Sequence, residues 1–137
     1  MMLANAHPGL SVGDGPVPDV DAVLAVKPQI APDVFPVLAE ARVPRLLSIA
    51  AGITTATMEA ALIEGISVVR SMPNTPALVG KGMAAIAPGV HATDADLEWA
   101  SSILTAVGRV VVVAEPDIDA VTGVSGSGPA YVFHLAE

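Results

Sequence analysis

The chain has 137 residues, 53% of them apolar but only 3% aromatic, so a single domain must build its core from Ala, Val, Ile and Leu. Its formal net charge is -8 and its few cations are scattered, which excludes the clustered basic surface that a nucleic-acid partner requires. The absence of cysteine excludes a disulfide framework, a thiolate metal site and redox chemistry at sulfur.

The first expected elements are a loop, a strand and a helix. Residues 1–18 are rich in Pro and Gly and lack hydrophobic periodicity, which predicts a loop. The short apolar run 20–26 predicts a buried strand that ends before Pro28. Apolar residues then recur at helical spacing over 34–41, with Asp33 as the expected N-cap and Pro36 in the first turn.

A second strand, a short helix and a third strand follow. The run 46–51 is mostly apolar and is the second strand candidate. Thr54 or Thr55 can cap a short helix that stops at Gly65. Residues 66–72, with Val68 and Val69 at their centre, predict the third strand.

The segment 70–82 leaves the third strand and has specific turn chemistry. Pro73 and Pro76 push the residues before them toward extended backbone, and Asn74 between them tolerates a left-handed kink. Taken alone, this segment is most simply a connector. Its place after a third strand favours a second interpretation, in which it forms one wall of a binding site.

Strand and helix signals alternate again after this segment. Residues 83–87 predict a further short strand. Thr93 and Asp96 resemble the two ends of a capping box, for a helix that runs to Val107. Residues 109–114 include four consecutive valines and predict another strand. This alternation indicates βαβ units, so the predicted fold class is α/β, a parallel sheet with flanking helices and right-handed crossovers.

The last segment has a different character. Gly123–Gly128 predicts a flexible turn, and Pro129 fits the first position of a helix. Residues 130–136 are apolar on almost every face, so that helix needs burial against something else. We therefore expect the C-terminal end of this chain to be truncated.

Parallel sheets bind ligands beyond the carboxyl ends of their strands. The segments that leave those ends here are 25–28, 50–52 and 71–76, and they consist of small or backbone-defining residues with one cation, Lys27. Small residues allow a flat ring, such as a nicotinamide, to approach the backbone closely. For segment 50–52 alone, close packing of a helix is the simpler explanation.

Motif searches for other chemistry give negative results. The phosphate-binding pattern G-x-G-x-x-G is met only by Gly13 and Gly15, with Pro18 in place of the third glycine and no strand before it. There is no P-loop. Residues 123–127 match four of the five positions of a nucleophile elbow, but no histidine with a partner acid follows, so a serine hydrolase is disfavoured.

Metal binding and membrane insertion are not expected either. The three histidines are isolated and lack metal-ligand spacing: His7, His91 and His134. Residues 1–8 contain no basic region followed by a long apolar one, so they do not form a secretory signal. Arg109 interrupts the longest apolar stretch, 103–114, well below membrane-spanning length. These features predict a soluble, cytoplasmic chain.

Four motifs in order and spacing resemble pyrroline-5-carboxylate reductase, over a region from about Val20 to the end of the chain. They are Val26-Lys27-Pro28, Ser48-Ile49-Ala50-Ala51-Gly52, Arg70-Ser71-Met72-Pro73-Asn74-Thr75-Pro76, and Val121-Thr122-Gly123-Val124-Ser125-Gly126-Ser127-Gly128-Pro129-Ala130-Tyr131. The resemblance implies reduction of the cyclic imine 1-pyrroline-5-carboxylate to L-proline with NADPH or NADH, the last step of proline biosynthesis. It also implies a partial Rossmann-type domain followed by the start of an all-helical dimerisation domain, and a homodimer or higher homo-oligomer.

The resemblance assigns roles to individual residues. Residues near the ribose and nicotinamide of the cofactor would be Ala25, Val26, Lys27, Pro28, Ile49, Ala50 and Ala51, with Asn74 in the wall where nicotinamide meets imine. Substrate-side residues would be Glu115, Thr122, Ser125 and Gly126. Glu115 could favour the protonated iminium, although for this residue alone a solvated loop acid is an equally good interpretation.

Parts of the family pattern are absent from this sequence. The glycine-turn strand, the strand that selects the ribose 2′ group and most of the helical domain, including its substrate-carboxylate loop and the subunit interface, have no counterpart. Residues 1–115 would therefore be a partial cofactor domain and 116–137 the beginning of the dimerisation domain. One alternative is a truncated fragment without activity. Another is a related NAD(P)-dependent imine or keto-acid reductase that shares the sheet.

Overall fold

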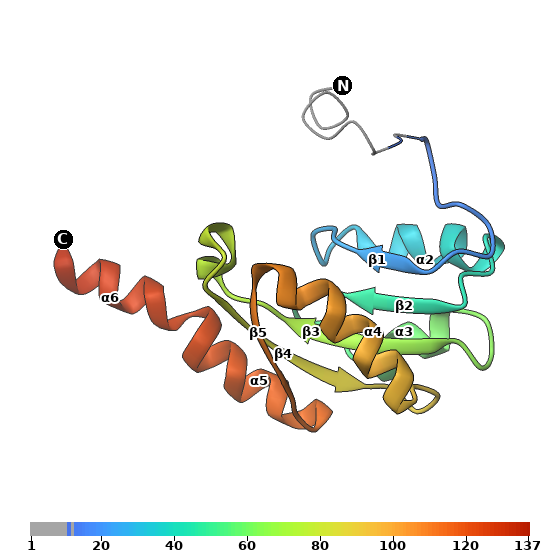
Figure 1. Cartoon of the computed structure of the whole chain (residues 1–137). Helices are drawn as coiled ribbons and strands as arrows, with labels where there is room; N and C mark the ends of the chain where they lie inside the picture. Colours follow the sequence, from blue (N-terminus) through green and yellow to red (C-terminus); the bar gives the residue numbers. More distant parts are fainter. Residues whose placement is uncertain (1–10, 12) are drawn as a thin grey trace.

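The computed structural model describes residue 11 and residues 13–137 (Figure 1). It contains a five-stranded sheet made of β1 (Ala22–Leu24), β2 (Arg45–Ser48), β3 (Ser67–Met72), β4 (Gly82–Pro88) and β5 (Gly108–Val112). The α-helices are α2 (Ala31–Glu40), α3 (Thr55–Ala61), α4 (Asp94–Leu104), α5 (Ile118–Val121) and α6 (Gly128–Ala136). Of the expected N-terminal loop, residues 1–10 and 12 lie outside the described residues, and 13–18 form neither helix nor strand.

The strands lie in chain order across the sheet, from β1 to β5. β1, β2 and β3 are parallel, so that Leu24, Ser48 and Arg70 lie side by side. β4 is antiparallel to β3, and β5 is parallel to β4. The expected α/β fold with flanking helices is confirmed, and the expected parallel pairing is found for every pair of neighbouring strands except β3 and β4. The connection 73–81 is too short for a parallel crossover, which needs about a dozen residues or more.

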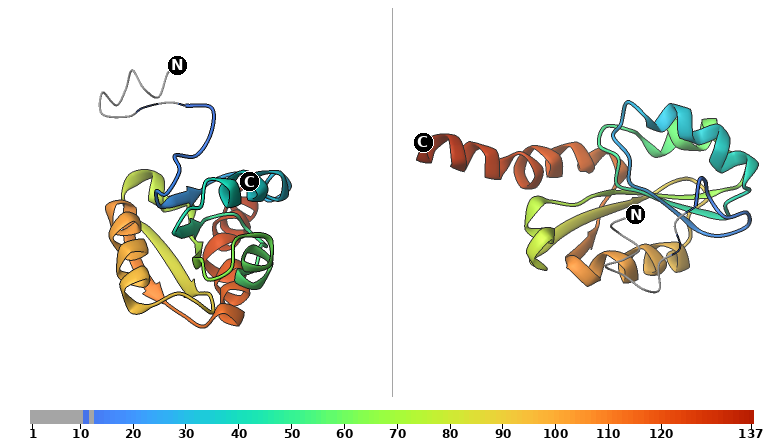
Figure 2. Two further views of the ribbon diagram at one scale, coloured as in Figure 1. Left: turned by 90° about the vertical axis from the view of Figure 1, so that its right-hand side faces the viewer. Right: turned by 90° about the horizontal axis from the view of Figure 1, so that it is seen from above.

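The helices form one layer on each face of the sheet (Figure 2). Under α2 and α3 the buried side chains include Leu24, Phe35, Leu38, Leu46, Met58 and Val68. Under α4 on the other face they include Leu47, Val69, Ile86, Ala100 and Leu104. Successive strand residues point to opposite faces, which explains why neighbours such as Val68 and Val69 contribute to different clusters.

Two of the expected helix starts are confirmed. Thr54 is the N-cap of α3, and its side chain accepts a hydrogen bond from the backbone N–H of Thr57 at 3.1 Å. At the start of α4, the carboxylate of Asp96 accepts hydrogen bonds from the backbone N–H of Thr93 at 2.8 Å and from its hydroxyl at 2.7 Å. This is the predicted capping box, with Asp in the usual Glu position.

The start of α2 differs from the prediction. Its N-cap is Ile30, and Asp33 lies within the first turn rather than before it. Pro36 is consequently inside the helix and not in its first turn. The helix begins earlier because Pro32 also fits the first turn, where a missing N–H leaves no hydrogen bond unmade.

The C-terminal segment is one helical rod and not a helix after a flexible turn. α5 is followed by a π-helical turn, Thr122–Gly126, in which the N–H of Ser127 donates to the carbonyl of Thr122 at 2.9 Å, and then by α6. α5 packs its buried Ile118 against Ala85 and Ala87, on the face of the sheet that α3 also covers. α6 projects beyond the sheet (Figures 1 and 2), and its large side chains are exposed. None of the described helices is long and apolar enough to span a membrane.

Candidate functional site

The predicted cofactor residues come together at one end of the sheet. Because β1, β2 and β3 are parallel, the segments 25–28, 49–51 and 73–74 leave the sheet at the same end. A hydrogen bond of 3.0 Å from the N–H of Ile49 to the carbonyl of Leu24 joins the first two segments. This end therefore presents the surface on which a parallel sheet binds its ligand.

The exposure of these residues is uneven. Ala25, Lys27 and Ala51 are exposed, whereas Val26, Pro28 and Ile49 are half-buried. Ala50 is only 2% exposed, and its N–H donates to the Ser48 hydroxyl at 3.2 Å. The small exposed side chains of Ala25 and Ala51 leave room for a flat ring, while the side chain of Ala50 is buried in the protein. A hollow of about 410 Å³ lies along the outer edge of β1 and includes Ala25 and Val26 in its lining.

Asn74 connects two parts of the chain through its side chain. Its backbone is extended, with φ -125°, so the expected left-handed kink at this residue was wrong. The left-handed conformation occurs instead at Gly80, with φ 69°, at the end of the 3-10 helix Thr75–Val79. The Oδ1 atom of Asn74 accepts the N–H of Met83 at 2.9 Å, and Nδ2 donates to the Ser125 hydroxyl at 2.9 Å. The predicted cofactor wall and the predicted substrate turn are therefore in direct contact.

The substrate-side residues of the π-helical turn are held against the sheet. Ser125 and Gly126 are half-buried, and a Cβ on Gly126 would lie 3.0 Å from Cε of Met72, which is tighter than ordinary packing. The hydroxyl of Thr122 donates to the carbonyl of Ile118 at 2.8 Å. Since that donation uses its only proton, the Thr122 hydroxyl can only accept from a ligand.

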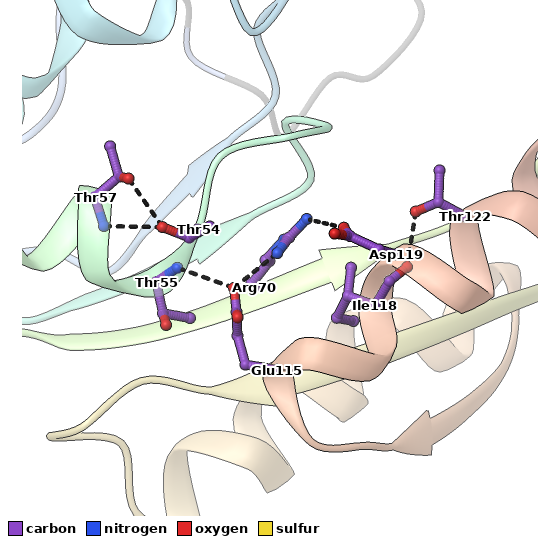
Figure 3. Close-up of polar contacts among 8 residues, drawn as sticks. All are labelled: Thr54, Thr55, Thr57, Arg70, Glu115, Ile118, Asp119 and Thr122. Carbon is purple, nitrogen blue, oxygen red and sulfur yellow. Dashed lines mark hydrogen bonds and ion pairs between the residues drawn. The ribbon is translucent and has the colours of Figure 1, made fainter.

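Glu115 belongs to an ion-pair network around Arg70 (Figure 3). Its Oε1 atom accepts from the Arg70 guanidinium at 2.7 Å and from the backbone N–H of Thr55 at 3.4 Å. A second carboxylate, Asp119, lies 3.4 Å from the same guanidinium. The carboxylate of Glu115, which was predicted to face the substrate, is thus partly neutralised by a cation. It also links the segment just before α5 to β3 and to the first turn of α3.

The sequence interpretation did not assign a role to Arg70. Its side chain is only 5% exposed. The available signal was its position as the one charged residue of an expected strand, because a buried charge must be paired. Such a position predicts an acidic partner, but it does not say which of the chain's acids it is.

A second ion-pair cluster lies at the opposite end of the strands. Arg45, the first residue of β2, bonds the carboxylate of Asp21 with Nε at 3.0 Å from Oδ1, and lies 4.7 Å from the ring centre of Trp99. The hydrogen bond with Asp21 raises the pKa of Arg45. Burial opposes ionisation of Asp96, but its hydrogen bonds with Thr93, together with Ser67 and the charge of Arg45, outweigh burial and lower its pKa. This cluster joins β2 to α4 and is distant from the candidate site.

The arrangement supports binding and positioning more than proton transfer. Within residue 11 and residues 13–137, no three His, Cys, Asp or Glu side chains gather as a possible metal site. The candidate site instead consists of small residues, two prolines, an amide and hydroxyls, with the Glu115 network beside it. Such a surface can hold two flat rings in contact and exclude water, which is what a hydride transfer requires of a protein.

Comparisons with known proteins give a consistent result, although no family model matches the sequence. The pyrroline-5-carboxylate reductase of Methanosarcina acetivorans is 48% identical over 117 residues, covering 84% of this chain and 43% of the relative. That of Mycobacterium tuberculosis is 46% identical over 123 residues, covering 84% of this chain and 42% of the relative. The chain thus spans less than half the length of these relatives.

Solved structures agree with the sequence relatives. The pyrroline carboxylate reductase of Plasmodium falciparum, solved with NADP bound, matches this chain with a TM-score of 0.76 at 32% identity. The matched region covers 82% of this chain and 44% of the Plasmodium protein. The enzyme from Coxiella burnetii has a TM-score of 0.73 at 36% identity, with 82% and 43% covered. This chain is therefore a relative of the pyrroline-5-carboxylate reductases, corresponding to less than half of their length, as the resemblance of its four motifs implied.

Proposed function

We propose that this chain provides the nicotinamide-facing and imine-facing part of a reductase that converts 1-pyrroline-5-carboxylate to L-proline with NADPH or NADH. The observation that carries the proposal is the hydrogen bond between Asn74 and Ser125. It joins the loop after β3, where the cofactor ring is expected, to the turn expected to face the substrate. The similarity to named reductases over 84% of the chain supports the same assignment.

The residues at the carboxyl end of the sheet fit a nicotinamide ring. Ala25 and Ala51 are exposed and small, so a ring can approach the ends of β1 and β2 without a steric clash. The side chain of Asn74 is engaged within the protein, so we assign it to shaping the wall rather than to holding the cofactor. The cofactor, when bound, supplies a hydride to the imine carbon, and the imine nitrogen takes up one proton.

The substrate side is the π-helical turn with Glu115. We propose that Ser125 and Gly126 face the substrate and that Thr122 accepts a hydrogen bond from it. The negative charge of Glu115 favours the positively charged iminium, which is the more electrophilic form of the substrate. Because Arg70 lies 2.7 Å from that carboxylate, the electrostatic effect of Glu115 is weaker than that of an unpaired acid.

The domain assignment and the oligomer are also part of the proposal. Residues 1–115 form the partial cofactor domain, and 116–137 begin a helical domain through which two copies associate. The exposed apolar side chains of α6 support this association: Tyr131, Val132, Phe133 and Leu135. The location of the protein in the cytoplasm stays a prediction.

Titration of the purified chain with NADPH, followed by nicotinamide fluorescence, tests cofactor binding directly. We expect saturable binding in the micromolar range, and Ala51→Phe should abolish it by filling the space beside the ring. Ala95→Phe is the matched control, because Ala95 is exposed on α4, on the opposite face of the sheet. The absence of NADPH and NADH binding would favour the alternative of an inactive fragment.

Activity is measured as oxidation of NADPH in the presence of either 1-pyrroline-5-carboxylate or a linear keto acid with ammonia. Turnover of the cyclic imine alone supports the proposal. Turnover of the linear keto acid alone would assign the chain to a related reductase of different substrate class.

A further inference from the structure

We propose that the outer edge of β5 is an interface at which a second copy of this chain adds its own β5 in antiparallel orientation, so that two sheets join into one. This interface is separate from the association through α6. It goes beyond the proposed function and does not rest on it.

The outer edge of β5 is open and apolar. β5 is the last strand of the sheet, and within the described residues it pairs with β4 alone. It enters a run of four consecutive valines, 110–113, of which Val111 is 40% exposed and Val112 is 54% exposed. Edge strands of natural proteins are usually protected from further pairing by charged residues, prolines or bulges. The run 110–114 contains no charged residue and no proline, so this edge can accept another strand.

The backbone groups of β5 alternate between β4 and the open edge. The N–H of Val113 donates to the carbonyl of Ile86 on β4 at 2.9 Å. Alternate residues of a strand direct their N–H and C=O groups to the same side, so the groups of Val111 also face β4. The groups of Val110 and Val112 consequently face outward, where no described strand pairs with them.

The positions of these outward groups fit a two-fold pair centred on Val111. In such a pair Val110 of one copy lies opposite Val112 of the other, and the reverse. Each of these two matches exchanges both backbone hydrogen bonds, which gives roughly four bonds across the interface. Val111 lies opposite itself on the axis, where the apolar side chains of both copies meet.

The two ends of β5 carry opposite charges. Near its first residue lies a hollow of about 400 Å³ whose lining includes Lys81 and Arg109. Neither cation takes part in an ion pair within residue 11 and residues 13–137. Near its last residue, Val112, lies a hollow of about 470 Å³ whose lining includes Asp94 and Glu98 of α4.

This charge pattern selects a second copy as the occupant and fixes its direction. Antiparallel pairing brings the basic hollow of each copy beside the acidic hollow of the other. A parallel arrangement would bring like charges together, which is unfavourable. The edge is therefore complementary to itself in one orientation.

The other edge strand, β1, is a poorer site for such pairing. It has three residues, Ala22–Leu24, and offers fewer outward backbone groups. Pairing of β5 with β1 of another copy would leave a free edge on each side, and this head-to-tail contact would continue into a filament. A β5 pair uses the same surface on both copies and closes as a dimer.

Disulfide trapping tests the contact directly, because the sequence contains no cysteine of its own. On the axis, opposite residues of a non-hydrogen-bonded pair have Cα atoms about 4.5 Å apart, which a disulfide can span. Mild oxidation should therefore convert Val111→Cys largely to a covalent dimer in non-reducing electrophoresis. Val23→Cys, at a similarly exposed valine of β1, is the matched control and should stay monomeric.

Two results of the trapping experiment would overturn the proposal. Equal dimer formation by both variants would show random collision of thiols. A dimer of Val23→Cys alone would assign the association to β1.

A charge exchange at the axis gives a second test, without a covalent bond. All samples carry Phe133→Glu, at an exposed position of α6, so that association through α6 is suppressed. Val111→Lys and Val111→Glu each place two like charges opposite each other, and each alone should weaken the dimer roughly 10-fold or more in sedimentation velocity. An equimolar mixture of the two should recover the dimer, which also shows that both variants are folded. A monomeric parent, or a mixture that stays monomeric, would refute the β5 interface.

Discussion

Replacement of Glu115 by Gln should destabilise the protein through the cation that it leaves behind. The Arg70 side chain is 5% exposed, and its nearest carboxylate is that of Glu115 at 2.7 Å. The glutamine side chain keeps the size and a hydrogen-bond acceptor but removes the negative charge. The remaining carboxylate, Asp119, lies 3.4 Å from the guanidinium and is 86% exposed, so it compensates only in part.

The magnitude follows from the burial of the two partners. Removing one partner of a fully buried ion pair costs about 3–5 kcal/mol. Because Glu115 is 25% exposed and Gln still accepts a hydrogen bond, we expect a loss of about 2 kcal/mol in the free energy of unfolding. For a domain of this size that corresponds to a decrease of roughly 8 °C in Tm. Asp119→Asn, at an exposed position, should cost at most about 0.5 kcal/mol.

Urea unfolding, followed by the fluorescence of the single tryptophan, Trp99, is a suitable assay. The tryptophan lies in α4, on the face of the sheet opposite to Glu115, so it reports global unfolding and not a local change. A double-mutant cycle of Arg70→Met and Glu115→Gln should give a coupling energy of at least about 1 kcal/mol. Glu98→Gln, exposed on α4, is the control for the chemical change alone.

Two results would refute this reasoning. One is a zero coupling energy, which would mean that Arg70 and Glu115 do not stabilise each other. The other is an equal loss for Asp119→Asn and Glu115→Gln, which would mean that burial does not determine the strength of the two contacts.

Three further predictions concern stability at other positions. The folded-state pKa of Asp96 is below the ordinary value of 3.8, so ionisation of Asp96 stabilises the protein at higher pH, and this stabilisation is lost as the pH falls through the folded-state pKa. Asp96→Asn should therefore reduce the loss of unfolding free energy at acid pH. Asp94→Asn, at an exposed position of the same helix, should not. Gly108→Ala should cost about 2 kcal/mol or more, because its Cβ would lie 2.1 Å from a carbonyl oxygen of β4, whereas Gly123→Ala, with open space around its Cβ, should be neutral or stabilising in the same urea titration. Ile118→Ala, at a fully buried side chain, should cost about 2–4 kcal/mol, and hydrogen exchange should then show loss of protection in α5 before the sheet; a uniform loss would contradict local undocking.

The local elements were largely predictable from the sequence. Most strands were visible as short, mainly apolar runs, since helices cover the inner strands on both faces of the sheet. Caps such as Thr54 and the Thr93 and Asp96 pair were readable because capping depends on residues a few positions apart. These features depend on local chemistry, which a sequence states directly.

Non-local features were predictable only in part. The antiparallel direction of β4 could have been inferred from the short connection 73–81. The apolar residues of β4 themselves do not indicate it, because they would be buried equally well in a parallel or an antiparallel strand. The partner of Arg70 lies 45 residues away in the sequence, and nothing local distinguishes Glu115 from other acids. The glycines of 123–128 favour a turn by propensity, whereas the structure continues the helix through the π-helical turn Thr122–Gly126.

The π-helical turn has a mechanical consequence for the exposed helix that follows it. A π turn holds one more residue than an α turn over nearly the same rotation about the helix axis, so deleting one residue from Thr122–Gly126 would leave an α turn, and α6 would keep its direction. The anchored end, at Ile118, would stay in place. The extra residue is thus accommodated within the turn that presents Ser125 and not along α6, where Tyr131, Phe133 and Leu135 are exposed. A partner bound to α6 would therefore contact a helix that is continuous, through this turn, with the residue Ile118 packed on the sheet.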